Sequence, residues 1–253
     1  MTTRQIGFIK RKVGRDVIII DSSLGFDIEK FVHAVDELLQ QEVSVDRELL
    51  GRGRVAILDI AGVGKIVLRQ YLRGGWLKKF VKETFLNFKS YPRPISELYT
   101  LQYLHEKGVN VPCPMGVLMR RKFFGLFYKG FIATMLIEDA ENLLNLLKSD
   151  KLNEREAQHL AFLAGQEAGK MMKLRVFHPD LHIGNVLVQV GEKSEGEISV
   201  LNAKAWLIDF DKAIVFAQNK IKEYQKKTIA RWVRSAEKHG VADVAVYPFE
   251  DGT

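Results

Sequence analysis

The residue types that could do chemistry gather in one short segment, residues 178–188, which reads His-Pro-Asp-Leu-His-Ile-Gly-Asn-Val-Leu-Val. Asp180 and Asn185 stand five residues apart in this segment. A carboxylate such as Asp180 can orient an acceptor hydroxyl in line with a phosphorus atom. An amide oxygen such as that of Asn185 can hold a Mg²⁺ ion between phosphates. The segment therefore predicts phosphoryl transfer, with residues 186–188 as an apolar strand behind the loop.

A second carboxylate follows 24 residues after Asn185, in residues 206–211, which read Trp-Leu-Ile-Asp-Phe-Asp. The apolar strand expected before Asp209 would deliver this carboxylate to the edge of a sheet. Mg²⁺ prefers one or two protein oxygens together with phosphate oxygens and water. Asn185 and Asp209 are therefore the predicted metal ligands, and a hairpin between them would place their loops side by side.

The pattern His178-x-Asp180-x-His182-x-x-Asn185, followed by a strand and Asp-Phe-Asp, resembles the protein-kinase-like superfamily in its small-molecule branches. The spacing of Asp and Asn is that of the kinase catalytic loop. Three other segments are similar to bacterial lipopolysaccharide-core kinases, which phosphorylate 3-deoxy-D-manno-octulosonic acid (Kdo) or heptose: residues 67–75, 93–97 and 108–114. The resemblance covers residues 50–235 and is weak in the first fifty.

This resemblance implies roles for further residues, with ATP and Mg²⁺ as cofactors. Arg69 stands where the family has its phosphate-binding lysine, and Glu97 on the following helix stands where its ion-pair partner is found. Gly51 and Gly53 would form a shortened loop over the phosphates. Glu138 falls where the hinge would offer backbone groups to adenine. Asp180 would be the catalytic carboxylate.

The elements that must position these residues form two parts. Residues 55–60 and 65–71 are apolar runs separated by a turn, which predicts a hairpin. A helix is expected near residues 27–40, a second from Pro94 to the C-terminal stop at Gly108, and strands near 115–119 and 131–137. The first part, residues 1–137, is thus a β-rich nucleotide-binding lobe with one main helix.

The second part, residues 138–253, is predicted to be mainly helical and catalytic. Asn153 and Glu156 resemble a capping box, and apolar residues at helical spacing follow them. Strands are expected at 186–190 and 205–208, and the C-terminal residues form one or two basic helices anchored by Trp232. The fold class is therefore α+β, a two-lobed protein-kinase-like fold with an antiparallel sheet in the first lobe.

Composition and charge restrict the function further. The chain has 253 residues, a net charge of +7 and a single cysteine, Cys113, which excludes an internal disulfide. Its apolar runs are too short for a membrane span or for the h-region of a signal peptide. Basic residues cluster in 65–93 and 220–238, which favours an anionic partner. We expect a cytoplasmic protein, peripheral on the cytoplasmic face of the inner membrane.

The resemblance and the charge together predict ATP-dependent phosphorylation of a Kdo or heptose hydroxyl in the anionic lipopolysaccharide inner core. The basic segment 73–93 would meet the sugar and the lipid A headgroup. No nucleic acid is expected as a partner, because no nucleic-acid motif accompanies the charge. His178 is expected to brace the loop by a hydrogen bond to the backbone.

Four alternatives stay open. The first is another small-molecule or protein kinase of the same fold, with a different acceptor. The second is a catalytically silent kinase-like binding module, which the arginine at position 69 keeps in consideration. The third is an adaptor that binds membranes or nucleic acid through its basic patches alone. The fourth is a metallohydrolase, with His178, Asp180 and His182 as a metal-binding triplet.

Overall fold

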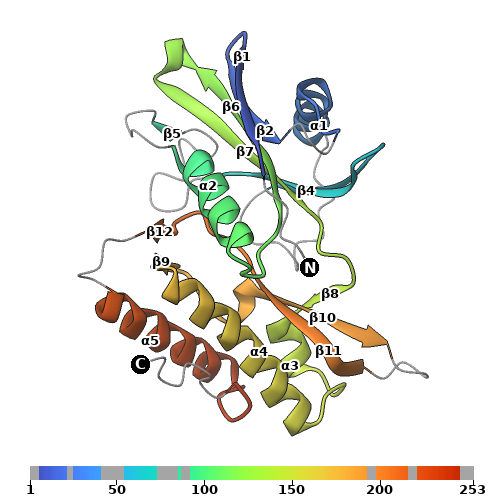
Figure 1. Ribbon diagram of the computed structural model, residues 1–253, viewed down its shortest axis with the longest axis vertical. Coiled ribbons are helices and arrows are strands. Elements are labelled where there is room, and N and C mark those ends of the chain that lie inside the picture. The colour runs from blue at the N-terminus through green and yellow to red at the C-terminus, as the bar shows by residue number, and fades with distance from the viewer. Residues whose placement is uncertain are drawn as a thin grey trace. The chain divides into compact units, whose positions relative to one another are not determined.

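The computed structural model describes residues 6–21, 25–40, 54–72, 85–86, 92–192, 198–215 and 221–245, with its elements labelled in Figure 1. The chain forms two compact units. The first unit contains residues 1–102 and 113–136, and the second contains residues 103–112 and 137–253. Among the described residues, none of the helices combines the length and the apolar character that crossing a bilayer demands.

An antiparallel sheet is the framework of the first unit. Its strand order is β1-β2-β6-β7-β4-β3, with β5 paired to β7. The strands are β1 (Phe8–Val13), β2 (Asp16–Asp21), β3 (Val55–Ile60), β4 (Gly64–Gln70), β5 (Phe85–Leu86), β6 (Pro114–Lys122) and β7 (Phe127–Met135). The predicted hairpin is confirmed as β3 and β4, whereas β6 and β7 are longer than expected. A short 3₁₀ turn, η3 (Phe123–Gly125), joins these two longer strands.

Helix α1 (Ile28–Gln40) covers one face of this sheet and confirms the first predicted helix. The core beneath it is apolar and includes Ile18, Ile20, Phe26, Phe31, Ile66, Leu68, Met115 and Phe131, each fully buried. Because side chains alternate along a strand, Arg69 on β4 points to the face opposite Ile66 and Leu68. The sheet thus carries its core on one face and the predicted phosphate-binding arginine on the other.

Helix α2 (Arg93–Glu106) begins as predicted, and Gly108 takes a left-handed φ of 76° just past its end. The start of α2 lies very close to β7. A Cβ atom on Gly130 would come within 2.6 Å of the Pro94 ring, so only glycine permits this approach. The close packing holds the first turn of α2, which carries Glu97, against the sheet.

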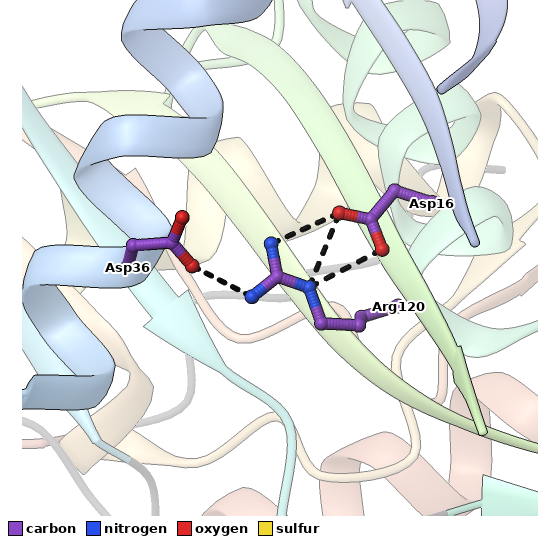
Figure 2. A network of polar contacts seen from close by, with 3 residues as sticks. All are labelled: Asp16, Asp36 and Arg120. Atoms are coloured by element: carbon purple, nitrogen blue, oxygen red, sulfur yellow. Dashed lines mark hydrogen bonds and ion pairs between the residues drawn. The ribbon is translucent and has the colours of Figure 1, made fainter. Parts of the chain in front are cut away.

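An ion-pair network joins three elements of the first unit, as Figure 2 shows. The guanidinium group of Arg120 on β6 donates hydrogen bonds to both carboxylate oxygens of Asp16 on β2 and, at 2.6 Å, to Asp36 on α1. Burial alone would lower the pKa of Arg120, but the hydrogen bonds and charges of the two aspartates raise it. The network therefore ties α1 to strands β2 and β6 of the sheet.

The second unit contains the longer helices and two small sheets. Its helices are α3 (Leu143–Lys148), α4 (Glu154–Lys173), the 3₁₀ turn η4 (Ile183–Asn185) and α5 (Ile221–His239). One sheet has the order β11-β10-β8, from β8 (Ala140–Asn142), β10 (Val186–Glu192) and β11 (Ile198–Leu207). The other pairs β9 (Val176–Phe177) with β12 (Ile214–Val215). Strand β11 begins earlier than the sequence predicted.

Two local predictions in the second unit are confirmed. Asn153 caps α4: its side chain accepts from the Glu156 backbone while the Glu156 carboxylate accepts from the Asn153 backbone. Trp232 on α5 is fully buried, and its indole N–H donates to the Ala245 carbonyl at 3.3 Å. The first contact fixes the start of α4, and the second ties α5 to the residues that follow it.

Candidate active site

The hairpin of β10 and β11 brings two predicted metal ligands together. Its register pairs Val186 with Leu207, so the residue before β10 and the residue after β11 lie level with each other. The Ile208 N–H donates to the Asn185 carbonyl at 3.1 Å and closes the hairpin one step further. Asn185 and Asp209 therefore stand at the same end of the same pair of strands, as the sequence predicted.

The side chain of Asn185 connects this hairpin to Asp180. Its amide Nδ2 donates to the Asp180 backbone carbonyl at 2.9 Å. That bond uses the donor end of the amide and leaves Oδ1 as its acceptor end. From β8, the Asn142 side chain donates to the Gly184 carbonyl at 2.8 Å, which supports the same loop. Side-chain hydrogen bonds therefore hold the loop at Asp180 and at Gly184.

His178 contacts the backbone beside Asp209, in keeping with the expected bracing role. Its ring is 1% exposed, lies 4.7 Å from the Phe210 ring and contacts the Ile208 carbonyl through Nε2 at 3.0 Å. Burial lowers the pKa of His178, so the imidazole is neutral and carries its proton on Nε2, where a carbonyl accepts it. The histidine thereby fixes the backbone directly before Asp209.

Asp209 itself has a left-handed backbone, with φ of 66°. Aspartate tolerates this region better than most residues, and such conformations cluster at functional sites. The buried Phe210 ring anchors the turn, and the Ala213 N–H donates to the Phe210 carbonyl at 3.0 Å. The charge of Asp209 acts on the His178 and His182 rings, and so does the charge of Asp180. Both carboxylates therefore lie close enough to act on the same two imidazoles.

Two cations contact the carboxylate of Asp180. Lys212 Nζ lies 2.5 Å from Oδ2, and Arg231 Nη2 on α5 lies 2.6 Å from Oδ1. Burial would raise the pKa of Asp180, but the hydrogen bond from Lys212 and the charges of Lys212 and Arg231 outweigh it and lower that pKa. Asp180 is thus ionised and held by a positive group on each oxygen.

Sequence reasoning missed both of these cations. Lys212 directly follows Asp-Phe-Asp, so its place beside the metal loop offered a local signal. Arg231 had no such signal, because it lies 51 positions from Asp180 in a basic run that also suits a solvated helix face. Their side chains are 50% and 43% exposed, so both remain accessible to a ligand.

His182 completes the surroundings of Asp180. Burial and the charge of Arg231 lower the pKa of His182 against the opposing charges of Asp180 and Asp209. A Cβ atom on Gly184 would lie 3.1 Å from the His182 ring, so glycine makes room for the imidazole. Within the described ranges, no group of three or more His, Cys, Asp and Glu residues is arranged to hold a metal ion, so the metallohydrolase triplet receives no support.

The predicted ion pair of the first unit is also present. Arg69 Nη2 lies 2.5 Å from Glu97 Oε1, and the Tyr71 hydroxyl donates to the other oxygen, Oε2. Glu97 is 3% exposed, and the Arg69 guanidinium lies over the Tyr71 ring with 5.0 Å to the centroid. The tyrosine, which sequence reasoning did not single out, fixes the carboxylate that in turn orients Arg69.

The remaining predicted residues add less to the site. Glu138 is exposed, and its backbone carbonyl accepts from the Gln189 side chain at 2.8 Å, which joins the start of the second unit to β10. Gly51 and Gly53 lie outside the described residues. The role of Glu138 beside adenine stays a prediction, as do the roles of the two glycines.

The donor set of the second unit fits a magnesium ion. Asn185 offers an amide oxygen oriented by its own N–H bond, and Asp209 offers a carboxylate at the same end of the hairpin. Oxygen donors of these two kinds are those that Mg²⁺ accepts beside phosphate oxygens. The types of these two side chains therefore fit the predicted role as Mg²⁺ ligands beside a phosphate group.

Comparison with known proteins finds relatives that are named as kinases. A 3-deoxy-D-manno-octulosonic acid kinase of Vibrio vulnificus (strain YJ016) is 34% identical over 164 residues, which are 64% of this chain and 61% of the relative. The kinase of the same name from Haemophilus influenzae (strain 86-028NP) is 32% identical over 180 residues, 70% of this chain and 69% of the relative. The match to the Vibrio relative thus spans less than two thirds of its length.

A solved structure described as WaaP in complex with acyl carrier protein shares the fold, with a TM-score of 0.56 over 92% of this chain and 89% of that one, at 16% identity. The predicted α+β, kinase-like fold class is confirmed. The family profile described as the lipopolysaccharide kinase (Kdo/WaaP) family matches residues 36–249. Since that match covers most of the sequence, the chain belongs to the lipopolysaccharide kinase (Kdo/WaaP) family.

Proposed function

We propose that this protein transfers the γ-phosphoryl group of ATP to a hydroxyl of Kdo in the lipopolysaccharide inner core. The observation that carries the proposal is the convergence of Asp180, Asn185 and Asp209 at one end of the β10–β11 hairpin. Family membership and the relatives named 3-deoxy-D-manno-octulosonic acid kinase support the choice of acceptor. A heptose acceptor would use the same site.

Asp180 would orient the acceptor hydroxyl and receive its proton. The hydroxyl oxygen forms a bond to the γ-phosphorus as the bond between that phosphorus and the bridging oxygen of ADP breaks. Asn185 and Asp209 would hold Mg²⁺, which neutralises phosphate charge when it is bound. Arg69, fixed by Glu97 and Tyr71, would bind nucleotide phosphate. The residues thus position and neutralise charge rather than form covalent intermediates.

The charges around Asp180 suit an acidic acceptor. Lys212 and Arg231 both contact the carboxylate of Asp180, so these three groups together carry one surplus positive charge. Kdo is itself a carboxylic acid. Lys212 and Arg231 would release Asp180 to the hydroxyl and pair with the acid group of the sugar instead. Exchange of one carboxylate for another keeps both cations compensated through the reaction.

The location proposed for this activity is the cytoplasmic face of the inner membrane, where the protein would be peripheral. A lipid A-linked acceptor presents its sugar at a membrane surface, and the net charge of +7 favours an anionic surface. The segment 73–93, to which the sequence assigned this contact, lies outside the described residues except for Phe85, Leu86, Pro92 and Arg93.

The test is phosphate transfer from ATP labelled at the γ position to Kdo-lipid A, with Mg²⁺ present. We expect the purified protein to label this acceptor and to leave lipid A without Kdo unlabelled. Labelling of a different acceptor from a panel of sugars and proteins, with none on Kdo, would replace the acceptor but keep the kinase. Omission of Mg²⁺ should abolish the transfer.

A silent binding module is the second candidate, and the ion pairs on both oxygens of Asp180 favour it. In that case the cations would keep Asp180 from any hydroxyl, and nucleotide would bind without turnover. Thermal unfolding with Mg-ATP, read together with the transfer assay, separates the cases, because a ligand that binds only the folded state raises the midpoint whether or not it is turned over. A raised midpoint without transfer to any acceptor would establish the silent module.

A further inference from the structure

The turn between β6 and β7 exposes large apolar side chains to solvent. Phe123 and Leu126 are 70% and 52% exposed, and Phe124 is fully exposed. The ring of Phe123 packs edge-on against Phe127 at 5.7 Å, so the aromatic group extends down the strand. Three exposed large apolar residues within four positions are clustered rather than scattered singly, and such a cluster can mark a site of interaction. We refer to residues 123–126 as the hairpin tip.

The backbone of the hairpin tip presents these side chains at a cost. Phe123 and Phe124 both have left-handed backbones, with φ of 48° and 54°. Bulky residues avoid this region, and strain of this kind persists where function requires it. The exposed ring of Phe124 gains no burial within the described residues that would offset the strain. The compensating contact is therefore expected from another surface.

Basic residues lie on the strands next to the hairpin tip. Arg121 and Lys122 precede it on β6, and the Arg121 N–H donates to the Arg15 carbonyl at 3.1 Å, which brings the β1–β2 turn alongside. Figure 1 shows this turn and the end of β6 at the same end of the first unit. The exposed cations on β1 and its turn are Lys10, Arg11, Lys12 and Arg15. The apolar Val13, which lies between them in the chain, is 50% exposed. Residues 6–15 and 117–130 contain no acid.

We propose that the hairpin tip and the cations just named on β1, the β1–β2 turn and β6, here called the basic collar, form one surface. By this surface the protein docks on an anionic lipid bilayer. Exposed phenylalanines beside lysine and arginine are the combination that inserts at the boundary of headgroups and acyl chains. An anionic bilayer offers both an apolar layer for the rings and negative charge for the cations beside them. A nucleic acid would neutralise the collar but leave the phenylalanines exposed to water.

The inference deepens the proposed peripheral location and assigns it to residues other than the basic segment 73–93. It also separates docking from chemistry, because none of the residues at the tip belongs to the candidate active site. Docking needs neither ATP nor sugar. A failure to bind lipid would therefore leave the proposed phosphoryl transfer standing, and a failure to phosphorylate would leave the docking surface standing.

The test is sedimentation of the full chain with vesicles made of equal parts phosphatidylcholine and phosphatidylglycerol. We expect the unchanged protein to bind these vesicles, to bind pure phosphatidylcholine at least tenfold more weakly, and to be released by salt, with this order of magnitude set by screened charge. The double variant Phe123→Ser, Phe124→Ser should lose about tenfold or more in affinity. Its thermal midpoint should match that of the unchanged chain, because both rings are exposed.

Matched controls decide between surfaces. Phe162→Ser removes an exposed phenylalanine of α4 in the second unit and should leave vesicle affinity unchanged. Arg121→Gln with Lys122→Gln should weaken binding, whereas Lys226→Gln on α5 should not. Equal loss from Lys226→Gln, equal binding to neutral vesicles, or full binding by the double phenylalanine variant would each overturn the proposal. Binding of RNA with no binding of vesicles would overturn it as well.

Discussion

Two ion-pair networks of this molecule are mirror images in charge. In the first unit one cation, Arg120, lies between two carboxylates, Asp16 and Asp36. In the second unit one carboxylate, Asp180, lies between two cations, Lys212 and Arg231. Both use short contacts between elements far apart in the sequence. Only the second stands beside the loop that carries Asn185 and Asp209.

The difference lies in what each network leaves unused. Asp16 is buried and gives both oxygens to Arg120, so its carboxylate is already engaged within the folded chain. Lys212 and Arg231 are about half exposed, and both contact the carboxylate of Asp180. In the proposed phosphoryl transfer this carboxylate would have to turn to the acceptor hydroxyl instead. In the first network the buried carboxylate has its partner within the folded chain. In the second, the two exposed cations could exchange the carboxylate of Asp180 for an acidic group of a substrate.

The largest expected effect sharpens this comparison by neutralising one carboxylate in each network. Asp180→Asn keeps the shape but removes the proton acceptor, so phosphate transfer to Kdo-lipid A should fall by about a hundredfold to ten-thousandfold. Its stability should change by no more than about 1 kcal/mol, because the lost partners are exposed. Transfer rates and unfolding midpoints measure the two effects.

Asp16→Asn is the matched control for this variant. It should lower the unfolding midpoint and leave the transfer rate per folded molecule unchanged, because Asp16 lies in the first unit's structural network. A wild-type rate for Asp180→Asn would remove Asp180 from the catalytic role. A large loss of rate in Asp16→Asn, at full folding, would erase the distinction between the networks.

The next effect concerns acceptor recognition by Arg231. Arg231→Met should raise the KM for the Kdo acceptor by about ten- to a hundredfold, since a charge-assisted hydrogen bond contributes roughly 1.5–3 kcal/mol. The kcat should change less, because Asp180 remains. Steady-state kinetics with Kdo-lipid A, and with an acceptor whose carboxylate is reduced to an alcohol, separate the two parameters.

The reduced acceptor should show little difference between Arg231→Met and the unchanged enzyme, because it lacks the group that Arg231 would bind. Arg234→Met, on the exposed side of the same helix, is the control and should behave like the unchanged chain. An equal rise in KM for both acceptors would show that Arg231 supports the loop rather than the sugar's acid group.

A moderate effect on stability is expected from the first network. Arg120→Met leaves the buried Asp16 carboxylate without its guanidinium partner, and an unsatisfied buried group costs about 1–3 kcal/mol. Denaturant unfolding should show this loss in the midpoint. Arg121→Met, at the next position of β6, should unfold like the unchanged chain. If Arg120→Met does so too, the network of Figure 2 contributes nothing to stability.

The sequence predicted those features that arise from neighbours in the chain. The β10–β11 hairpin follows from two apolar runs, the cap of α4 from Asn153 and Glu156, and the end of α2 from Gly108. The cap and the helix end depend on residues a few positions apart, and the hairpin joins two strands that follow each other directly in the chain, so local physics decides them. The level placement of Asn185 and Asp209 follows from the same hairpin.

The features that it did not predict join residues far apart in the chain. Arg120 finds Asp16 and Asp36 from 104 and 84 positions away, and Arg231 finds Asp180 from 51. Such pairs depend on how strands and helices pack, and a basic residue in a helix looks the same whether it meets solvent or a carboxylate. Arg69 and Glu97 were paired only through the resemblance to a family.

The smallest effect tests Lys212 through pH. Burial raises the pKa of Asp180, but the hydrogen bond and charge of Lys212 and the charge of Arg231 lower it below its usual value. The active, ionised form is therefore present above this lowered pKa and is lost as the pH falls through it. Lys212→Met removes a lowering contribution, so the acid limb of the kcat/KM profile should move to higher pH. Lys222→Met, on the exposed surface of α5, should leave that limb in place. A limb that stays fixed in Lys212→Met would mean that Arg231 alone sets the ionisation of Asp180, and that the two cations of the second network are not equivalent.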